Sequence, residues 1–261
     1  MNKQETLSVT LIQTNLHWED AQANRDMFSK KIENISQATD LIVLPEMFST
    51  GFSMSAKLLA EPNHGETLQW MQQQAKKTGA AITGSVIILE NGNYYNRLFF
   101  VLSNGDYKTY DKKHTFTLAN EHRTYTAGSN RLVVDYKGFR ICPLICYDLR
   151  FPVWARNTVD YDVLLYVANW PAKRIAAWDA LLKARAIENM AYCVGVNRVG
   201  EDGNGHVYTG HTGVYDVLGA SMLDTEPEKE FVATLTLKKE HIKKHREHLQ
   251  FLQDRDSFIL T

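Results

Sequence analysis

Residues 140–152 join an apolar stretch to a polar one, and this junction constrains the fold more than any other feature of the sequence. The apolar stretch is typical of a buried strand, and the polar residues after Cys146 cannot extend such a strand at low cost. The chain must therefore turn at Cys146, at the carboxyl end of the strand. Open α/β sheets bind ligands at such ends. Most free cysteines are inert core residues, so the function of Cys146 depends on what the rest of the chain brings to it.

A second apolar run, residues 41–44, is followed by a proline and then by Glu46. An uninterrupted apolar run suits a parallel strand covered on both faces, and Pro45 marks its end because proline cannot donate to a ladder. Glu46 is therefore expected at a carboxyl strand end, as Cys146 is. A carboxylate there is a candidate general base for a thiol, although a glutamate that follows a strand is as often a solvated surface residue.

The segment 107–116 has the pattern of a strand that ends in two lysines, and Glu121 follows it. With Glu46, Lys112 and Cys146 in this order, the chain resembles the nitrilase (carbon–nitrogen hydrolase) superfamily, whose triad is Glu-Lys-Cys. The resemblance extends from about Val9 to about Asp256. It is carried by three boxes, Leu44-Pro45-Glu46, Asp111-Lys112-Lys113-His114 and Cys146-Tyr147-Asp148-Leu149-Arg150-Phe151-Pro152.

Three later segments, 168–174, 184–189 and 195–200, look most like the ω-amidase branch of this superfamily. These enzymes hydrolyse the terminal amide of 2-oxo acid monoamides such as 2-oxoglutaramate and 2-oxosuccinamate. Other members of the superfamily act on deaminated glutathione or on N-carbamoyl compounds, and these substrates remain alternatives.

Helices and strands alternate along the whole chain, which by itself predicts an α/β protein. The resemblance adds a four-layer αββα sandwich, completed as αββα–αββα when two subunits form a homodimer. No linker composition interrupts residues 1–261, so we expect a single carbon–nitrogen hydrolase domain. Helices are predicted over 24–35, 66–77 and 177–190, and strands over 8–15, 80–89, 95–102, 162–168, 191–199, 206–216 and 230–237.

The resemblance implies amide hydrolysis through a thioester on Cys146. In this mechanism Glu46 acts first as base and then as acid, and the ammonium of Lys112 favours the thiolate and stabilises the oxyanion. The backbone N–H of Tyr147 is the expected second oxyanion donor. Glu121 is expected to bind the lysine and to orient the substrate amide.

Only one of the two adjacent lysines can enter the pocket, because successive side chains of a strand point to opposite faces. The family's lysine stands two residues before the histidine of its box, which selects Lys112. We expect Lys113 to face away, toward solvent.

The carboxylate of a 2-oxo acid amide needs a cation at the far end of the pocket. Arg174 is the first candidate for a bidentate clamp, although a residue at the start of a helix is as often a surface residue. The expected pocket walls are Phe116, Tyr125 and Trp170.

The net charge of −1 argues against a nucleic-acid partner or a membrane surface, both of which need a basic field. The amino-terminal residues show no signal-peptide pattern, and the three cysteines form neither a disulfide framework nor a metal knuckle. A protein of the reducing cytoplasm is therefore expected, and the resemblance adds a small-molecule amide as its substrate. The triad supplies its own nucleophile, acid and oxyanion donors, so we expect no metal and no cofactor. His241, His245 and His248 have metal-ligand spacing, but the lysines around them favour a solvated basic helix.

Two alternatives to this mechanism remain. A cysteine–histidine hydrolase would use His114 or His122 as its base, although no feature of the sequence favours either over Glu46. A non-catalytic binding module with a relict site is less compatible with the sequence, because every position of the triad is filled.

Overall fold

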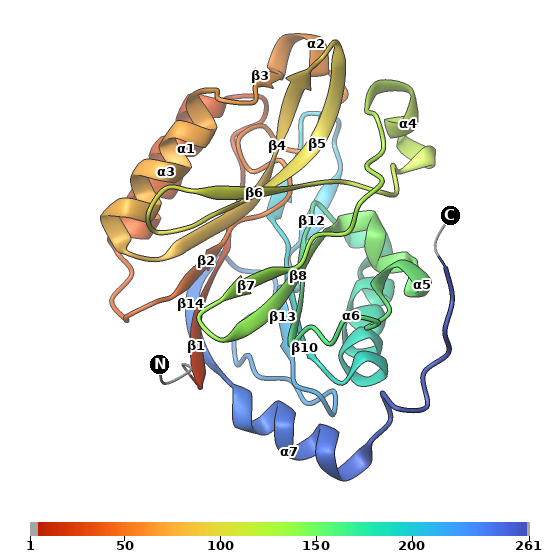
Figure 1. The fold of residues 1–261 in the computed structure, drawn as a ribbon. Coiled ribbons are helices and arrows are strands. Elements are labelled where there is room, and N and C mark those ends of the chain that lie inside the picture. Colours follow the sequence, from red (N-terminus) through yellow and green to blue (C-terminus); the bar gives the residue numbers. More distant parts are fainter. Residues whose placement is uncertain (1–4, 260–261) are drawn as a thin grey trace.

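Two β-sheets lie face to face in the middle of the molecule, and helices cover the outer side of each (Figure 1). The computed structural model describes residues 5–259. Within them, one sheet has seven strands, in the order β14-β1-β2-β4-β5-β6 with β3 paired to β4, and the other has five, in the order β13-β10-β9-β8-β7. The layers run helix, sheet, sheet, helix, which confirms the predicted αββα sandwich.

The strands of the larger sheet are β1 (Thr6–Gln13), β2 (Leu41–Val43), β3 (Glu61–Pro62), β4 (Ala81–Glu90), β5 (Asn93–Val101), β6 (Tyr107–Asp111) and β14 (Phe231–Lys238). Those of the smaller sheet are β7 (Val134–Tyr136), β8 (Phe139–Ile145), β9 (Val163–Val167), β10 (Tyr192–Val196) and β13 (Gly213–Tyr215). A separate hairpin consists of β11 (Val199–Glu201) and β12 (Val207–Thr209).

Helices α1 (Ala21–Glu33) and α3 (Glu66–Thr78) cover the larger sheet, and α6 (Ile175–Asn189) covers the smaller one. Helix α1 begins at Asp20, whose carboxylate accepts a hydrogen bond from the Ala23 N–H at 2.9 Å. Helix α3 ends at Gly79, which has a φ of 70° and so takes the left-handed conformation that closes many helices. The remaining helices are α2 (Ala56–Leu59), α4 (Glu121–Thr124), α5 (Pro152–Ala155), α7 (Lys239–Leu249) and the 3₁₀ turns η1 (Thr117–Ala119), η2 (Cys146–Arg150) and η3 (Ala172–Arg174).

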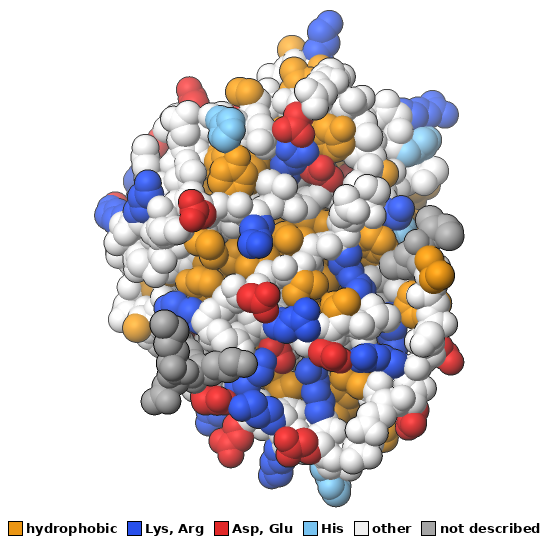
Figure 2. All heavy atoms as spheres, in the orientation of Figure 1, with side chains coloured by type: hydrophobic (Ala, Val, Ile, Leu, Met, Phe, Trp, Pro, Cys, Tyr) orange, Lys and Arg blue, Asp and Glu red, His pale blue; other side chains and the backbone are white. Residues whose placement is uncertain are grey.

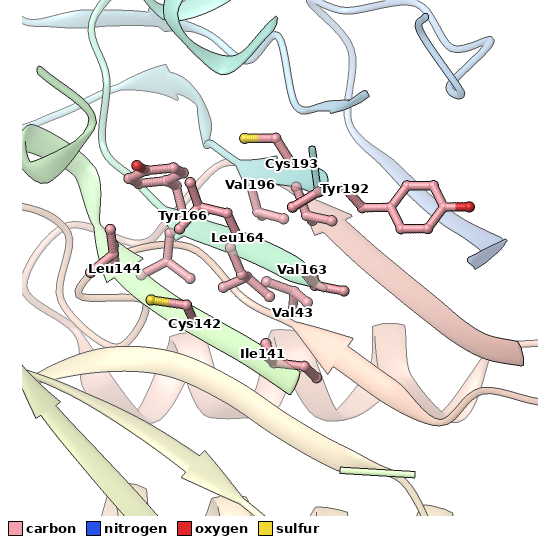
Figure 3. Packing of buried hydrophobic residues seen from close by; sticks show 14 of the residues in the cluster. Val43, Ile141, Cys142, Leu144, Val163, Leu164, Tyr166, Tyr192, Cys193 and Val196 are labelled. Carbon is pink, nitrogen blue, oxygen red and sulfur yellow. The ribbon is translucent and has the colours of Figure 1, made fainter. Parts of the chain in front are cut away.

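The main core fills the space between the sheets with side chains from both (Figure 3). Val43 of the larger sheet packs in the same cluster as Ile141 and Val163 of the smaller one. Two of the three cysteines, Cys142 and Cys193, are fully buried in this cluster. They are packing residues, as most free cysteines are.

The predicted hairpin at 80–102 is confirmed, with its turn at Asn91 and Gly92, both of which have positive φ. The single strand predicted at 206–216 is wrong, because the chain there forms β12 and then β13 in different sheets. The break falls at Gly210 and His211, with φ of 74° and 59°, values that an extended strand does not contain. The strand predicted at 191–199 is divided in the same way between β10 and β11.

Acidic and basic side chains are interspersed around α7, at the bottom of the face that Figure 2 shows. In α7, His241 lies 3.2 Å from Asp216 and its ring stacks on Tyr192.

No helix of the described chain combines the length and the apolarity that crossing a membrane requires.

Candidate active site

Three parallel strands end at the same edge of the sandwich, and polar side chains follow each of them. Strand β2 is followed by Glu46, β8 by Cys146 and β9 by Asn169. These residues meet, because the Asn169 N–H donates to Glu46 Oε2 at 2.9 Å and Cys146 Sγ lies 3.9 Å from the Asn169 carbonyl oxygen. The two carboxyl strand ends inferred from the sequence therefore face each other across the two sheets.

Cys146 occupies the sharp turn that the sequence predicted. It has a φ of 44°, a conformation that costs free energy for most residues with a side chain and persists where the surrounding structure imposes it. The turn takes the chain from β8 directly into η2 and lets the thiol line a cavity instead of the core.

Lys112 lies between two buried carboxylates. Its Nζ donates to Glu46 Oε1 at 2.9 Å and to Glu121 Oε1 and Oε2 at 3.0 and 2.9 Å, and its side chain is 1% exposed. Lys113 points away, as the strand register predicted, but its ammonium lies 5.4 Å from the centre of the Trp154 ring. The side chain is partly exposed and lines a second cavity, so it lies away from Cys146 and reaches solvent beside this ring.

The charges of this cluster control one another. Burial lowers the pKa of Lys112, but Glu121 and Glu46 together raise it more, so the net pKa is raised and the side chain stays an ammonium. For Glu121, burial and the neighbouring Glu46 carboxylate raise the pKa against the opposing effect of Lys112.

The thiol of Cys146 has a pKa well above its ordinary value. Burial raises it most and the Glu46 carboxylate raises it further, while Lys112 lowers it by less. The resting residue is thus a protonated thiol next to a carboxylate. Lys112 only partly offsets the burial, so formation of the thiolate requires a base in contact with the thiol.

A cavity of about 220 Å³ opens beside Cys146. Aromatic and apolar side chains form most of its wall, including the predicted Phe116 and Trp170, and Lys112 also lines it. The predicted Arg174 lines it too, with its guanidinium 5.0 Å from the centre of the Phe116 ring. The other lining residues are Phe52, Met54, Ala119, Tyr147, Arg150, Asn169, Pro171, Asn204, His206 and Tyr208.

The placement of Tyr125 in the pocket wall is corrected by the structure. Tyr125 follows the short helix α4 and packs with Met47, Ala56 and Ile87, behind the cavity. Its hydroxyl donates to the backbone oxygen of Ser53, and the ring is 3% exposed. The turn of α4 keeps Glu121 in the site and carries Tyr125 away from it.

Two asparagines without a predicted role also hold Glu46. Asn96 Nδ2 donates to Glu46 Oε1 at 2.8 Å and lies 3.5 Å from Glu121 Oε1, and Asn169 contributes its backbone N–H. Asn96 did carry a signal, because it is a polar residue in the apolar strand β5 and its buried amide needs partners. The residues of the β11–β12 loop that line the cavity carried no comparable signal.

The two histidines considered as alternative bases do not line this cavity. His114 Nδ1 lies 2.7 Å from Asp148 Oδ1, and its ring stacks on Phe151 beside a different cavity. His122 is exposed in α4. Of the candidate bases, only Glu46 lies with Cys146 and Lys112 in one cluster.

Comparison with known proteins agrees with this geometry. The family model for carbon–nitrogen hydrolases matches residues 8–247. The omega-amidase YafV of Yersinia enterocolitica is 47% identical over 255 residues, which cover 98% of this chain and 99% of the relative. The 2-oxoglutaramate amidase of Bacillus subtilis is 34% identical over 206 residues, which cover 77% of this chain and 79% of the relative.

A solved structure extends the likeness to three dimensions. XC1258 of Xanthomonas campestris, a CN-hydrolase superfamily protein with an arsenic adduct in its active site, superposes with a TM-score of 0.95. It is 43% identical in sequence, and the match covers 98% of this chain and 99% of that one. These matches confirm the predicted enzyme class, a hydrolase of carbon–nitrogen bonds other than peptide bonds. The chain belongs to the carbon–nitrogen hydrolase family, the nitrilase superfamily, and groups with its ω-amidase members.

Proposed function

We propose that this enzyme hydrolyses the terminal amide of a small 2-oxo dicarboxylic acid monoamide, such as 2-oxoglutaramate or 2-oxosuccinamate, to the acid and ammonia. The observation that carries the proposal is a cavity that Cys146 and two arginines line together with Lys112, whose ammonium is held by the buried carboxylates of Glu46 and Glu121. Relatives that share up to 47% of the sequence bear the names omega-amidase and 2-oxoglutaramate amidase.

The first half-reaction forms a thioester. Glu46 takes the proton of Cys146, and the sulfur attacks the amide carbon to form a tetrahedral intermediate. Its negative oxygen is stabilised by the ammonium of Lys112 and by the backbone N–H of Tyr147. Glu46 then gives its proton to the amide nitrogen, the carbon–nitrogen bond breaks, and ammonia leaves.

The second half-reaction releases the acid. Glu46 takes a proton from a water molecule, whose oxygen attacks the thioester carbon. The carbon–sulfur bond breaks, and the proton returns to Cys146. One carboxylate therefore serves as both base and acid. Glu121 supports both steps by keeping Lys112 charged and in place through two hydrogen bonds.

Arg174 is proposed to bind the carboxylate of the substrate. Arg174 and Arg150 both line the cavity, and neither forms an ion pair with any other part of the described chain. Each is held over an aromatic ring instead, Arg174 over Phe116 and Arg150 over Trp170. These unpaired cations favour an anionic substrate. They also disfavour glutamine, whose α-ammonium would add a third positive charge in a largely apolar wall.

An ammonia-release screen tests the proposal. The substrates are 2-oxoglutaramate, 2-oxosuccinamate, glutamine, asparagine, an N-carbamoyl amino acid, deaminated glutathione and an aliphatic nitrile. We expect the two 2-oxo acid amides to have the highest kcat/KM. Equal turnover of glutamine would overturn the substrate assignment but not the family, and a preference for deaminated glutathione or the N-carbamoyl compound would place the enzyme with the alternative amidases.

We further propose that the enzyme is a cytoplasmic homodimer of single-domain subunits. Apolar side chains are exposed on the outer helices and the tail, with Val153 of α5 54% exposed, Phe251 54% and Ile259 88%. A second subunit would cover such a surface. Leu260, the next apolar residue of this tail, lies outside the described residues. Sedimentation that finds only monomer at micromolar concentration would refute the dimer.

The cytoplasm is proposed because the thiol must stay reduced.

A further inference from the structure

The carboxylate of Asp148 is fully buried two residues after the nucleophile. Its Oδ2 accepts a hydrogen bond from the backbone N–H of Ile145 at 3.0 Å, which closes the turn that carries Cys146. The same oxygen accepts from the Tyr110 hydroxyl at 2.7 Å. Its Oδ1 accepts from the backbone N–H of His114 at 3.0 Å and lies 2.7 Å from the Nδ1 of that residue.

The partners of Asp148 lie on both sides of Lys112. Tyr110 precedes the lysine by two residues and His114 follows it by two. Across residues 5–259, every hydrogen bond between the segment 107–116 and the segment 139–150 ends on Asp148. The Tyr110 hydroxyl extends the connection, since it also accepts from the Lys113 N–H at 3.2 Å and from Trp154 Nε1 at 3.1 Å.

We propose that Asp148 is a positioning residue, whose carboxylate fixes the turn of Cys146 against the end of β6 that carries Lys112. This inference rests on the proposed function in one respect, that Lys112 and Cys146 act together on the oxyanion. Asp148 does not line the cavity and so does not contact the substrate. Glu46 and Glu121 hold the ammonium of Lys112, whereas Asp148 holds the backbone on which that side chain and the thiol both depend.

A buried carboxylate with several donors also stabilises a fold, and the experiment must separate that effect from positioning. Asp162 provides a matched control. It is also buried, and its Oδ2 accepts from the backbone N–H of Arg140, at the opposite end of the same strand β8, at 2.8 Å. Asp162→Asn and Asp148→Asn both replace one accepting oxygen with an amide N–H that cannot accept.

We expect Asp148→Asn to lower kcat for 2-oxoglutaramate about 10²-fold, the typical cost of misplacing a catalytic group by about 1 Å, with KM nearly unchanged. Asp162→Asn should lower the midpoint of thermal unfolding while keeping kcat close to that of the wild type. Tyr110→Phe removes a single donor to Asp148 and should show a smaller loss of kcat in the same direction. If Asp148→Asn does not fold, Tyr110→Phe decides the matter. A kcat within about twofold of the wild type in the folded variant, or an equal loss in Asp162→Asn, would overturn the proposal.

A second readout needs no substrate, so its failure is distinct from failure of the proposed function. The rate at which iodoacetamide alkylates Cys146 is measured against pH in the wild type and both variants. Because Lys112 lowers the pKa of this thiol, a less closely held lysine should shift the alkylation profile of Asp148→Asn to higher pH. The profile of Asp162→Asn should coincide with that of the wild type. Coincidence of all three profiles would contradict positioning even if the substrate assignment holds.

Discussion

Cys142 and Cys146 lie four residues apart and border the same core cluster, yet only Cys146 also lines the cavity. Cys142 points into the core within β8, where burial raises its pKa to about 12. Burial raises the pKa of Cys146 as well, so low polarity does not distinguish the two. What distinguishes Cys146 is the turn after it, which exposes the thiol to a cavity and brings Glu46 and Lys112 beside it. As the proposed nucleophile, Cys146 would depend on a base and a cation within reach, not on an intrinsically acidic thiol.

Replacement of each cysteine in turn is the most direct test of the difference between Cys142 and Cys146. We expect Cys146→Ala to abolish ammonia release, because no thioester can form. Cys142→Ala should keep its activity and lose stability, since it removes only a buried sulfur from the core. Steady-state ammonia release and thermal unfolding of both variants check this. A Cys146→Ala enzyme with measurable turnover above the uncatalysed rate would contradict the assignment of the nucleophile.

Glu46→Gln removes the proposed base but keeps the shape of the side chain. General acid–base catalysis contributes about 10²–10⁴ in rate, so we expect kcat to fall by that factor. The reactivity of the thiol toward an alkylating agent should rise where the rate of hydrolysis falls. The Glu46 carboxylate raises the pKa of Cys146, so without it the pKa falls and alkylation by iodoacetamide should begin at lower pH. If hydrolysis falls in Glu46→Gln but the pH profile of alkylation is unchanged or moves to higher pH, a direct Glu46–Cys146 contact is contradicted.

The two adjacent lysines give the next comparison. Removal of an oxyanion donor typically lowers kcat about 10²–10³-fold, so Lys112→Ala should be nearly inactive. Lys113→Ala should retain most of its activity, because its ammonium lies over Trp154 and lines a different cavity. The kcat values of the two variants, measured alongside their circular dichroism spectra, provide the check. A reversed order would require a different register for β6.

The positions of Glu46 and Cys146 could be predicted from the sequence because strand ends are marked locally, whereas the family resemblance selected Lys112 from two adjacent lysines. Pro45 ends one apolar run and the polar residues after Cys146 end another, so each residue's place follows from its immediate neighbours. The fold class followed in the same way, and the resemblance supplied the αββα layers. Asn96 and Asp148 could not be assigned, because their importance depends on partners 50 and 38 residues away in the chain. Tyr125 was misplaced because one turn of α4 decides which way its ring points.

Arg174→Met tests the proposed clamp for the substrate carboxylate. A hydrogen bond to a charged group contributes about 1.5–3 kcal/mol, so Arg174→Met should weaken binding of 2-oxoglutaramate by roughly one to two orders of magnitude. The loss should be in KM, with kcat little changed, because the carboxylate interaction is equally present in the ground state and the transition state. Arg150→Met is the matched control at the same cavity. If Arg150→Met has the larger effect on KM, the carboxylate clamp is Arg150 and not Arg174.

Chelation should have the smallest effect of all. Both proposed half-reactions use the side chains of Glu46, Lys112 and Cys146 and one backbone N–H, and no step uses a Lewis acid. Dialysis against EDTA, followed by assay in metal-free buffer, should therefore leave kcat and KM unchanged, whereas iodoacetamide at the same stage should abolish activity through Cys146. One sample receives both treatments in turn, so the effects of chelation and of alkylation are measured on the same enzyme. A contradicting result would be activity that is lost on dialysis and returns on addition of Zn²⁺ or Mg²⁺. It would show that the thiol, its base and its lysine do not suffice. The mechanism would then need a metal-bound water or a metal-polarised carbonyl in place of the Lys112 ammonium.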